Sequence, residues 1–158
     1  MTIDELDSRL IAALRESPRV GLLEISRRLG VARGTVQARL AKLEARGVIT
    51  GYGPEVDPAA MGYGIQAFVL LELAQGRLAE ASAVLEDVPE VVEADAISGP
   101  QDLLCRLVAR DTEHLQEIVN RILSTAAIRR STSYIVLSQQ VKPRTGPLVA
   151  AAGAARAK

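Results

Sequence analysis

Hydrophobic residues recur three or four positions apart in the first third of the chain, which is the spacing of one face of an α-helix. Thr2 and Glu5 have the spacing of a capping box before the first such segment, and glycines follow the second and the third. A tight connection joins the last two segments, as in a helix-turn-helix motif. We therefore predict a helix-turn-helix domain over residues 1–52, winged by an extended segment that begins at Val48. The expected helices cover residues 4–17, 22–29 and 33–46.

The pattern changes after residues 53–64, which are rich in glycine and proline and are expected to form a hinge. Beyond them, apolar runs and helical segments follow in the order strand-helix-strand-strand-helix-strand, the split βαβ arrangement of ferredoxin-like domains. We predict such an α+β sandwich over residues 65–142, and a disordered tail over 143–158 because that segment is dominated by Ala and Gly. The expected strands are 66–73, 91–97, 103–109 and 131–138, and the expected helices are 77–85 and 112–123, the second capped by Thr112.

Charge is distributed unevenly along the chain, although the formal net charge is zero. Residues 19–53 hold seven basic and two acidic residues, whereas residues 64–141 hold six basic and eleven acidic residues. A basic segment joined to an acidic one is typical of a nucleic-acid-binding domain attached to a domain with another role. The alternative is that surface charge simply varies from helix to helix.

Composition excludes several other classes of protein. The single cysteine, Cys105, can form no internal disulfide and cannot supply the paired ligands of the common metal motifs. No stretch reaches the roughly 18 apolar residues of a membrane span, and the polar start of the chain does not resemble a secretion signal. We expect a cytoplasmic protein without cofactor, metal or membrane partner. His114, the only histidine, is predicted to be a surface residue.

The third predicted helix distributes its side chains in an unusual way. Val36, Leu40 and Leu43 fall on one side, which is the expected core face. A merely solvated helix would place its long charged residues opposite the core. Here the opposite side carries small residues, which allow close approach to base edges in the major groove of DNA, and basic residues line the flanks. The small residues are Gly34, Ala38, Ala41 and Ala45.

Short motifs run through both halves of the chain. In the first half they are Leu6-Asp7 with Ile11 and Leu14, Glu24-Ile25-Ser26, Leu29-Gly30-Val31, Arg39, Leu43-Glu44, Gly47-Val48-Ile49 and Gly51-Tyr52, and in the second half they are Ser98-Gly99 and Asp102-Leu103-Leu104. Together they resemble the motifs of the Lrp/AsnC (feast/famine) family of bacterial and archaeal transcription regulators over about residues 2–142, and those of the second half resemble its glycine-aspartate turn. Two departures stand out: Ala32 replaces a serine-type helix cap, so that Thr35 or a phosphate must serve instead, and Gln101 replaces an aromatic residue.

The resemblance and the side-chain chemistry together assign DNA binding to the third helix and the end of the second. Thr35, Gln37 and Arg33 are the candidates for base readout, because glutamine pairs bidentately with adenine and arginine with guanine. With so few readers, we expect modest sequence specificity helped by DNA bending. Arg39 has an internal ion pair as its alternative role, because it lies nearest the core face. The expected phosphate contacts are Arg28, Arg39, Lys42 and Arg46, and Ala38 leaves room for the groove.

The resemblance further implies that the second half forms a homodimer through its sheet, that dimers assemble into octamers, and that a small effector, usually an amino acid, binds between dimers. Both faces of the strand at 103–109 are largely apolar, so one face needs a partner. Backbone N–H groups of the SGPQD turn can hold a carboxylate, and Asp102 can hold an ammonium group. The alternative is a plain β-turn in which Asp102 satisfies nearby backbone groups. The expected effector site is Ser98, Gly99, Pro100, Gln101, Asp102, Ser131 and Ser133.

The main hypothesis is therefore a sequence-specific DNA-binding transcription regulator, modulated by an amino acid or another small metabolite and not an enzyme. One alternative is an enzyme on the same architecture, since tetrapyrrole decarboxylases are similar to this family. One histidine, no acid–base cluster and the basic third helix disfavour it. Another alternative is an architectural DNA-binding protein without an effector, which only ligand binding distinguishes from the main hypothesis.

Overall fold

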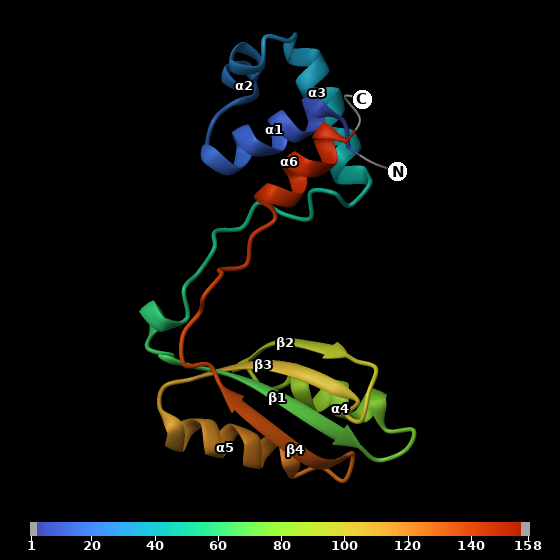
Figure 1. The fold of residues 1–158 in the computed structure, drawn as a ribbon, viewed down its shortest axis with the longest axis vertical. Coiled ribbons are helices and arrows are strands. Elements are labelled where there is room, and N and C mark those ends of the chain that lie inside the picture. The colour runs from blue at the N-terminus through green and yellow to red at the C-terminus, as the bar shows by residue number, and fades with distance from the viewer. Residues whose placement is uncertain (1–2, 156–158) are drawn as a thin grey trace. The chain divides into compact units, whose positions relative to one another are not determined.

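A computed structural model of the chain describes residues 3–155 and shows two compact units (Figure 1). The first unit combines the chain up to Pro54 with the segment from Val141 onward, and the second covers Glu55–Gln140. We refer to them as the first unit and the sheet unit. The chain therefore enters the sheet unit once and leaves it once, and two covalent segments connect the units.

Three helices form the predicted helix-turn-helix in the first unit: α1 (Glu5–Glu16), α2 (Leu22–Leu29) and α3 (Arg33–Ala45). Leu10, Ile25, Val36 and Leu43 are almost fully buried where the three helices meet. Gly30 ends α2 in the left-handed conformation, with a φ of 70°, which glycine adopts without steric cost. The helix-turn-helix is thereby confirmed, and its core is aliphatic.

The N-terminus of α1 corrects one prediction. Its capping box is formed by Asp4 and Asp7, each of which accepts a hydrogen bond from the backbone N–H of the other, at 2.9 and 3.1 Å. We expected Thr2 and Glu5 in these roles, but Glu5 is the first residue of the helix and Thr2 lies outside the described residues. Two carboxylates in one capping box were not recognised because Asp at the third helical position is a less familiar signal than Glu.

The prediction of a disordered C-terminal tail is also wrong. Residues 146–154, expected to be disordered, form helix α6 (Gly146–Ala154), which packs against α1 (Figure 1). Alanine is the best helix former, and Pro147 stands in the first turn, where a proline is tolerated. Val149 and Ala152 pack against the core of the helix-turn-helix, which gives α6 the tertiary contacts that a nine-residue helix needs.

The predicted wing is absent from the part of the chain that the structure describes. Residues 46–64 contain no strand and have only one short helical turn, η1 (Ala59–Met61). The hinge predicted at 53–64 thus falls on a segment without regular pairing, and the boundary between the units lies within it, after Pro54.

The sheet unit has the predicted order of elements. Strands β1 (Ile65–Leu73), β2 (Val91–Ala96), β3 (Leu103–Ala109) and β4 (Ile128–Ile135) form one antiparallel sheet in the order β2-β3-β1-β4. Helices α4 (Leu78–Glu86) and α5 (Thr112–Leu123) lie on one side of the sheet (Figure 1). This is the ferredoxin-like βαββαβ sandwich, with β2 and β4 as its edge strands.

Two details of the sheet unit differ from the predictions. The last strand begins at Ile128, three residues earlier than expected, and ends at Ile135. The N-cap of α5 is Asp111 rather than Thr112, because the Asp111 carboxylate accepts a hydrogen bond from the His114 N–H at 2.8 Å.

The core lies between the sheet and the two helices, and its most buried members include Val69, Leu71, Leu107, Ile118 and Ile122. None of the described helices is long and apolar enough to cross a membrane.

Candidate functional site

The outer side of α3 matches the prediction from the helical wheel. Val36 and Leu43 are buried and Leu40 is half-buried, so these three residues hold the helix to α1 and α2. The residues on the opposite side are all exposed and none is larger than alanine. They are Gly34, Ala38, Ala41 and Ala45. A smooth strip of this kind lets a helix backbone approach another surface closely.

Polar and basic side chains flank this strip. Arg33, Thr35, Gln37 and Lys42 are exposed, and Arg46, at the C-cap of α3, is half-buried. Lys42 lies on one flank, whereas Glu44, the acidic residue of the helix, lies on the other. The predicted base readers and the predicted phosphate contacts are therefore on the surface, with the exception of Arg39 and, in part, Arg46.

Arg39 takes the alternative role of an internal ion pair. Its guanidinium contacts the carboxylate of Asp4 and lies 2.9 Å from that of Asp7, the two residues of the capping box of α1. The hydrogen bond from Arg39 is the largest cause that lowers the pKa of Asp4 below its ordinary value of 3.8, and the two carboxylates raise the pKa of Arg39. This Asp4–Asp7–Arg39 cluster ties the middle of α3 to the start of α1 and engages the Arg39 guanidinium inside the unit.

Arg28, at the end of α2, is exposed but already has partners. Its Nε lies 3.3 Å from a carboxylate oxygen of Glu24, and it donates a hydrogen bond to the Ser17 hydroxyl at 3.3 Å. An exposed pair one helical turn apart contributes little to stability, so a phosphate can compete for the guanidinium. Arg28 remains a candidate contact at the edge of the surface.

The N-terminus of α3 has no side-chain cap. The N–H groups of Thr35 and Val36 donate to the carbonyl of Ala32, at 3.0 and 3.2 Å, and no side chain accepts a hydrogen bond from the first turn. The predicted departure at Ala32 is confirmed, and Thr35 does not take over as the cap. The first N–H groups of the helix therefore face outward, where water or an anion can satisfy them.

Tyr52 contacts α3, although its sequence motif predicted no role for it. Its hydroxyl donates a hydrogen bond of 2.6 Å to Glu44, near the C-terminal end of α3. Partial desolvation and this carboxylate raise the pKa of Tyr52 to about 12. The bond holds the segment after α3 against the helix and occupies the one acidic side chain on its flank.

In the sheet unit, the SGPQD turn connects β2 to β3. Gly99 has a φ of 137°, a conformation that favours glycine, and Ser98, Pro100 and Asp102 are exposed. Asp102 binds β1 through both its main chain and its side chain: its N–H donates to the carbonyl of Leu71 at 2.9 Å, and its Oδ2 accepts from the N–H of Leu73 at 2.7 Å. One oxygen of the carboxylate thus satisfies backbone, as the plain-turn alternative expects.

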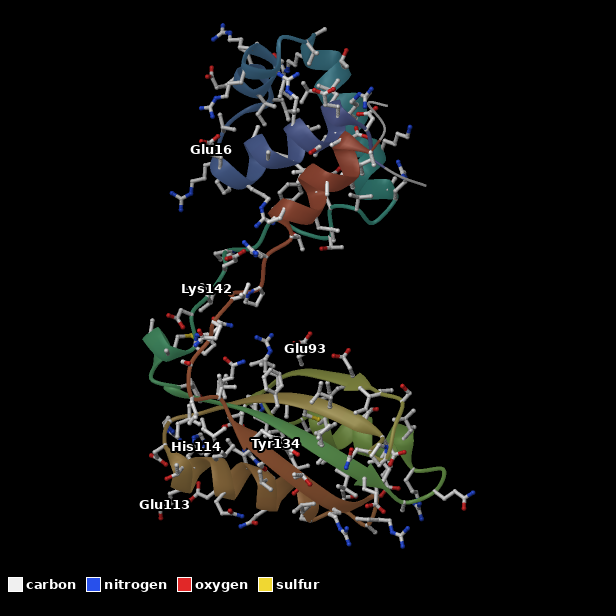
Figure 2. The ribbon with its side chains drawn as sticks, viewed as in Figure 1. Glu16, Glu93, Glu113, His114, Tyr134 and Lys142 are labelled. Carbon is white, nitrogen blue, oxygen red and sulfur yellow. The ribbon has the colours of Figure 1, made fainter. Side chains whose placement is uncertain are left out.

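The side of the sheet away from α4 and α5 carries no helix among the described residues. We call it the open face; its central residues are Phe68, Leu70, Leu104, Arg106, Thr132 and Tyr134. Phe68 pairs with both Tyr134 and Arg106 in register, and the side-chain Nε of Arg106 lies 3.0 Å from the Glu93 carboxylate of β2. Figure 2 shows Glu93 and His114 on opposite sides of the sheet. Apolar and aromatic side chains with one ion pair are thus exposed together.

Comparison with known proteins places both units in one family. The AsnC-type helix-turn-helix domain matches residues 3–44, and the Lrp/AsnC ligand-binding domain matches residues 66–147. The chain belongs to the Lrp/AsnC family of transcriptional regulators. The HTH-type transcriptional regulator FL11 of Pyrococcus horikoshii is 31% identical over 135 residues, which is 85% of this chain and 89% of that protein. The resemblance stated from the motifs is confirmed, and the chain is a DNA-binding transcriptional regulator.

Solved structures of Lrp/AsnC proteins match the fold. The structure of Escherichia coli AsnC has a TM-score of 0.85 and 28% identity, and the match covers 93% of this chain and all of that chain. A transcriptional regulator from Neisseria meningitidis, solved as a complex with L-Met, has a TM-score of 0.79 and 26% identity over 92% of this chain and 96% of that one. The helix-turn-helix plus ferredoxin-like architecture is therefore shared with structures that include an amino-acid complex.

The two serines predicted for the effector site of this Lrp/AsnC regulator lie across β1 from the turn. Ser131 pairs with Leu71, which also pairs with Leu103 on the other side, so Asp102 and Ser131 occupy the same end of the sheet. Two strand spacings separate them, roughly 10 Å. Ser131 is half-buried, and Ser133 is exposed two pairs further along, opposite Val69. Ser131 therefore lies at the same end of the sheet as the turn, whereas Ser133 lies nearer the middle of the sheet.

The prediction that His114 is a surface residue is wrong, because the residue is only 8% exposed. Its Nδ1 accepts a hydrogen bond from the Arg110 N–H at 3.2 Å, and its Nε2 lies 3.4 Å from the Glu90 carboxylate, which also contacts Arg121 at 2.9 Å. The sequence did hold a signal for this burial. His114 precedes Ile118 and Ile122 by four and eight positions, so the three residues share one face of α5, and all three are buried. The cluster joins the loop before β2 to α5 and is structural.

Proposed function

We propose that α3 is the recognition helix of this regulator and that its strip of small residues lies against the floor of the DNA major groove. The observation that carries the proposal is the exposure of Gly34, Ala38, Ala41 and Ala45 between two polar flanks. A major groove admits an α-helix, and the absence of long side chains on the strip leaves the flanks to meet the two phosphate walls. The side chains that reach DNA are then those on the flanks.

The flanking residues divide by chemistry. Lys42 and Arg46, with Arg28 at the edge, neutralise phosphates, and the N–H groups at the uncapped N-terminus of α3 donate hydrogen bonds to a further phosphate oxygen. Gln37, Thr35 and Arg33 lie nearer the base edges and supply what sequence preference the helix has. Because Arg39 is occupied by Asp4 and Asp7, the phosphate contacts are fewer than the basic residues of the helix.

The salt dependence of binding tests this division. We expect Lys42→Ala to weaken binding of the full chain to a labelled duplex of random sequence and to reduce the slope of log K against log salt by about one for each bound subunit. Arg129→Ala, which removes an exposed cation of β4 in the other unit, is the matched control and should leave both quantities unchanged. An unchanged slope in Lys42→Ala would remove Lys42 from the DNA contacts.

We also propose that the open face joins two copies of the chain into a homodimer, and that dimers assemble further, to an octamer. Phe68 and Tyr134 are 37% and 57% exposed in the single chain, although aromatic residues of this size are usually covered. A two-fold interface would pack the Phe68–Tyr134 pair of one copy against the same face of the other, and the Arg106–Glu93 pair would fix the register.

For the effector, we propose an amino acid bound at the SGPQD turn. The Neisseria meningitidis relative was solved with L-Met, and this chain matches it over 92% of its length. The N–H groups of Gly99 and Gln101 suit a carboxylate, and the second oxygen of Asp102 suits an ammonium group, while Ser131 and Ser133 of β4 lie at or near this end of the sheet. The ligand would then bridge the turn and a neighbouring surface, either β4 or a second dimer.

Calorimetry with the twenty amino acids tests this assignment. We expect at least one to bind the wild-type chain, and Asp102→Asn to weaken it at least tenfold, because the amide keeps an acceptor for the Leu73 N–H but loses the charge. Glu117→Gln, on the exposed side of α5, serves as the charge-matched control. If no amino acid bound, the architectural DNA-binding alternative would be favoured; equal binding by Asp102→Asn would place the ammonium elsewhere.

We further propose that the protein acts in the cytoplasm, where its DNA target lies, and has no catalytic role. The relatives that match it are transcriptional regulators. His114, the residue that an acid–base mechanism would most readily use, is buried and binds Arg110 and Glu90. Decarboxylase activity on the same architecture would need a polar cleft, and the described residues most suited to one are already paired within the fold.

A further inference from the structure

Helix α6 lies along α1 in the first unit, which we now call the DNA-binding unit, although it comes from the far end of the chain (Figure 1). The Ser8 hydroxyl donates a hydrogen bond to the carbonyl of Val149 at 3.1 Å, and Arg15 donates to the Thr145 hydroxyl at 2.7 Å. These two bonds fix both the start of α6 and its middle. The tail is thus a fourth helix of the DNA-binding unit with a defined position on α1.

Gly153 marks the place where the two helices come closest. It is buried, and a Cβ atom added to it would lie 2.5 Å from Ser8 Cβ and 3.4 Å from the carbonyl oxygen of Asp4. Ser8 Cβ is fixed to the backbone of α1 and cannot rotate away. Any residue larger than glycine at position 153 therefore forces α6 away from α1.

The closest approach falls beside the residues that hold α3. Asp4 is the N-cap of α1, and its carboxylate accepts hydrogen bonds from the Asp7 N–H at 2.9 Å and from the Arg39 guanidinium. Gly153 approaches the backbone carbonyl of the same residue. We propose that α6 is a positioning element for the recognition helix: by packing on Ser8 and Asp4 it holds the Asp4–Asp7–Arg39 cluster, and through Arg39 the orientation of α3.

This arrangement gives the sheet unit a second connection to the DNA-binding unit. Strand β4 ends at Ile135, and the chain then runs through residues 136–145 directly into α6. Residues 136–145 have no regular secondary structure, so this connection is a covalent one. The positioning role of α6 rests on the proposed DNA contacts of α3 and not on the proposed effector site.

A pair of matched substitutions within α6 tests the positioning role. Gly153→Ala adds the Cβ that meets Ser8, whereas Gly146→Ala adds a Cβ whose nearest neighbour is Arg15 Nε at 4.0 Å. Both changes raise helix propensity, so a harmful effect of the first alone is steric. The full chain is used, with hydrogen exchange of residues 146–155 to report docking of α6 and a labelled random-sequence duplex to report DNA binding.

We expect Gly153→Ala to remove the exchange protection of α6 and to weaken DNA binding roughly tenfold, with the salt slope unchanged because no phosphate contact is lost. Gly146→Ala should match the wild type. Protection of α6 that persists in Gly153→Ala would overturn the proposal, as would loss of protection with unchanged DNA affinity. Combined with Arg39→Gln, Gly153→Ala should have a much smaller additional effect, and full additivity would show that α6 does not act through Arg39.

Discussion

The outer side of α3 and the open face of the sheet are both left uncovered by the chain itself, and they differ in what they expose. Along α3, residues no larger than alanine alternate with cations and amides, whereas the sheet presents Phe68, Leu70 and Tyr134 around a single ion pair. Small residues with flanking positive charge suit a rigid polyanion with a groove. Aromatic and aliphatic residues suit another protein surface, here a second copy. An uncovered surface therefore indicates its partner by composition.

The open face offers the largest effect. Phe68→Asp places a carboxylate at the centre of the proposed dimer interface, where burial without a partner is costly, and should raise the dimer dissociation constant more than ~100-fold. The side chain points away from the core, so the fold should persist, which circular dichroism can confirm. Sedimentation measures the assembly, with Ala83→Asp on the exposed side of α4 as the control. A dimer as stable as the wild type would show that this face is not the interface.

On α3, a change in base readout should be smaller and restricted to preferred sites. Gln37→Ala is expected to weaken binding to a duplex selected by the wild type from a random pool by roughly 5- to 150-fold, since one bidentate base contact contributes ~1–3 kcal/mol. Affinity for unselected DNA should change little, because phosphate contacts remain. Competition binding with both duplexes measures the ratio. An equal loss on both duplexes would mean that Gln37 does not read sequence.

The Asp4–Asp7–Arg39 cluster should contribute a smaller, pH-dependent stability to the same unit. Because the pKa of Asp4 is lowered in the folded state, its contribution is present above the ordinary value of 3.8 and is lost as the pH falls through the lowered pKa. We expect Arg39→Gln to reduce the free energy of unfolding by about 1 kcal/mol near pH 6, and by less at pH 3.

Thermal unfolding by circular dichroism at several pH values checks this expectation. Arg33→Gln is the control, because Arg33 is an exposed cation on the same helix, away from the capping box. A destabilisation by Arg39→Gln that stayed constant between pH 6 and pH 3 would contradict the assignment of the ion pair.

Much of this fold could be predicted from hydrophobic spacing. The helical periodicity around Leu10, Ile25 and Val36 and the alternation along residues 103–109 indicate faces that must be buried, and the structure buries them. The same spacing shows which side of α3 is not part of the core. The strip of small residues on that side of α3 could therefore be predicted from the sequence.

The outcomes for the tail, Arg39 and His114 depend on contacts between residues far apart in the sequence. The tail was judged by composition alone, whereas α6 owes its stability to Ser8, Arg15 and the core, more than a hundred positions away. Arg39 could be placed near the core face, but its choice between a phosphate and an ion pair depended on where the start of α1 lies. The burial of His114 likewise depends on Glu90, which follows a different helix.

The central claim, that the small-residue strip of α3 lies in the DNA groove, can be tested most directly by adding bulk without charge. Ala38→Leu keeps helix propensity and changes an exposed residue, so the fold and the cations are retained. Binding of the full chain to the selected duplex, measured by fluorescence anisotropy, is compared with Ala83→Leu on α4 as the control. We predict a loss of about 100-fold or more for Ala38→Leu and none for Ala83→Leu. Wild-type affinity in Ala38→Leu would contradict insertion of this face.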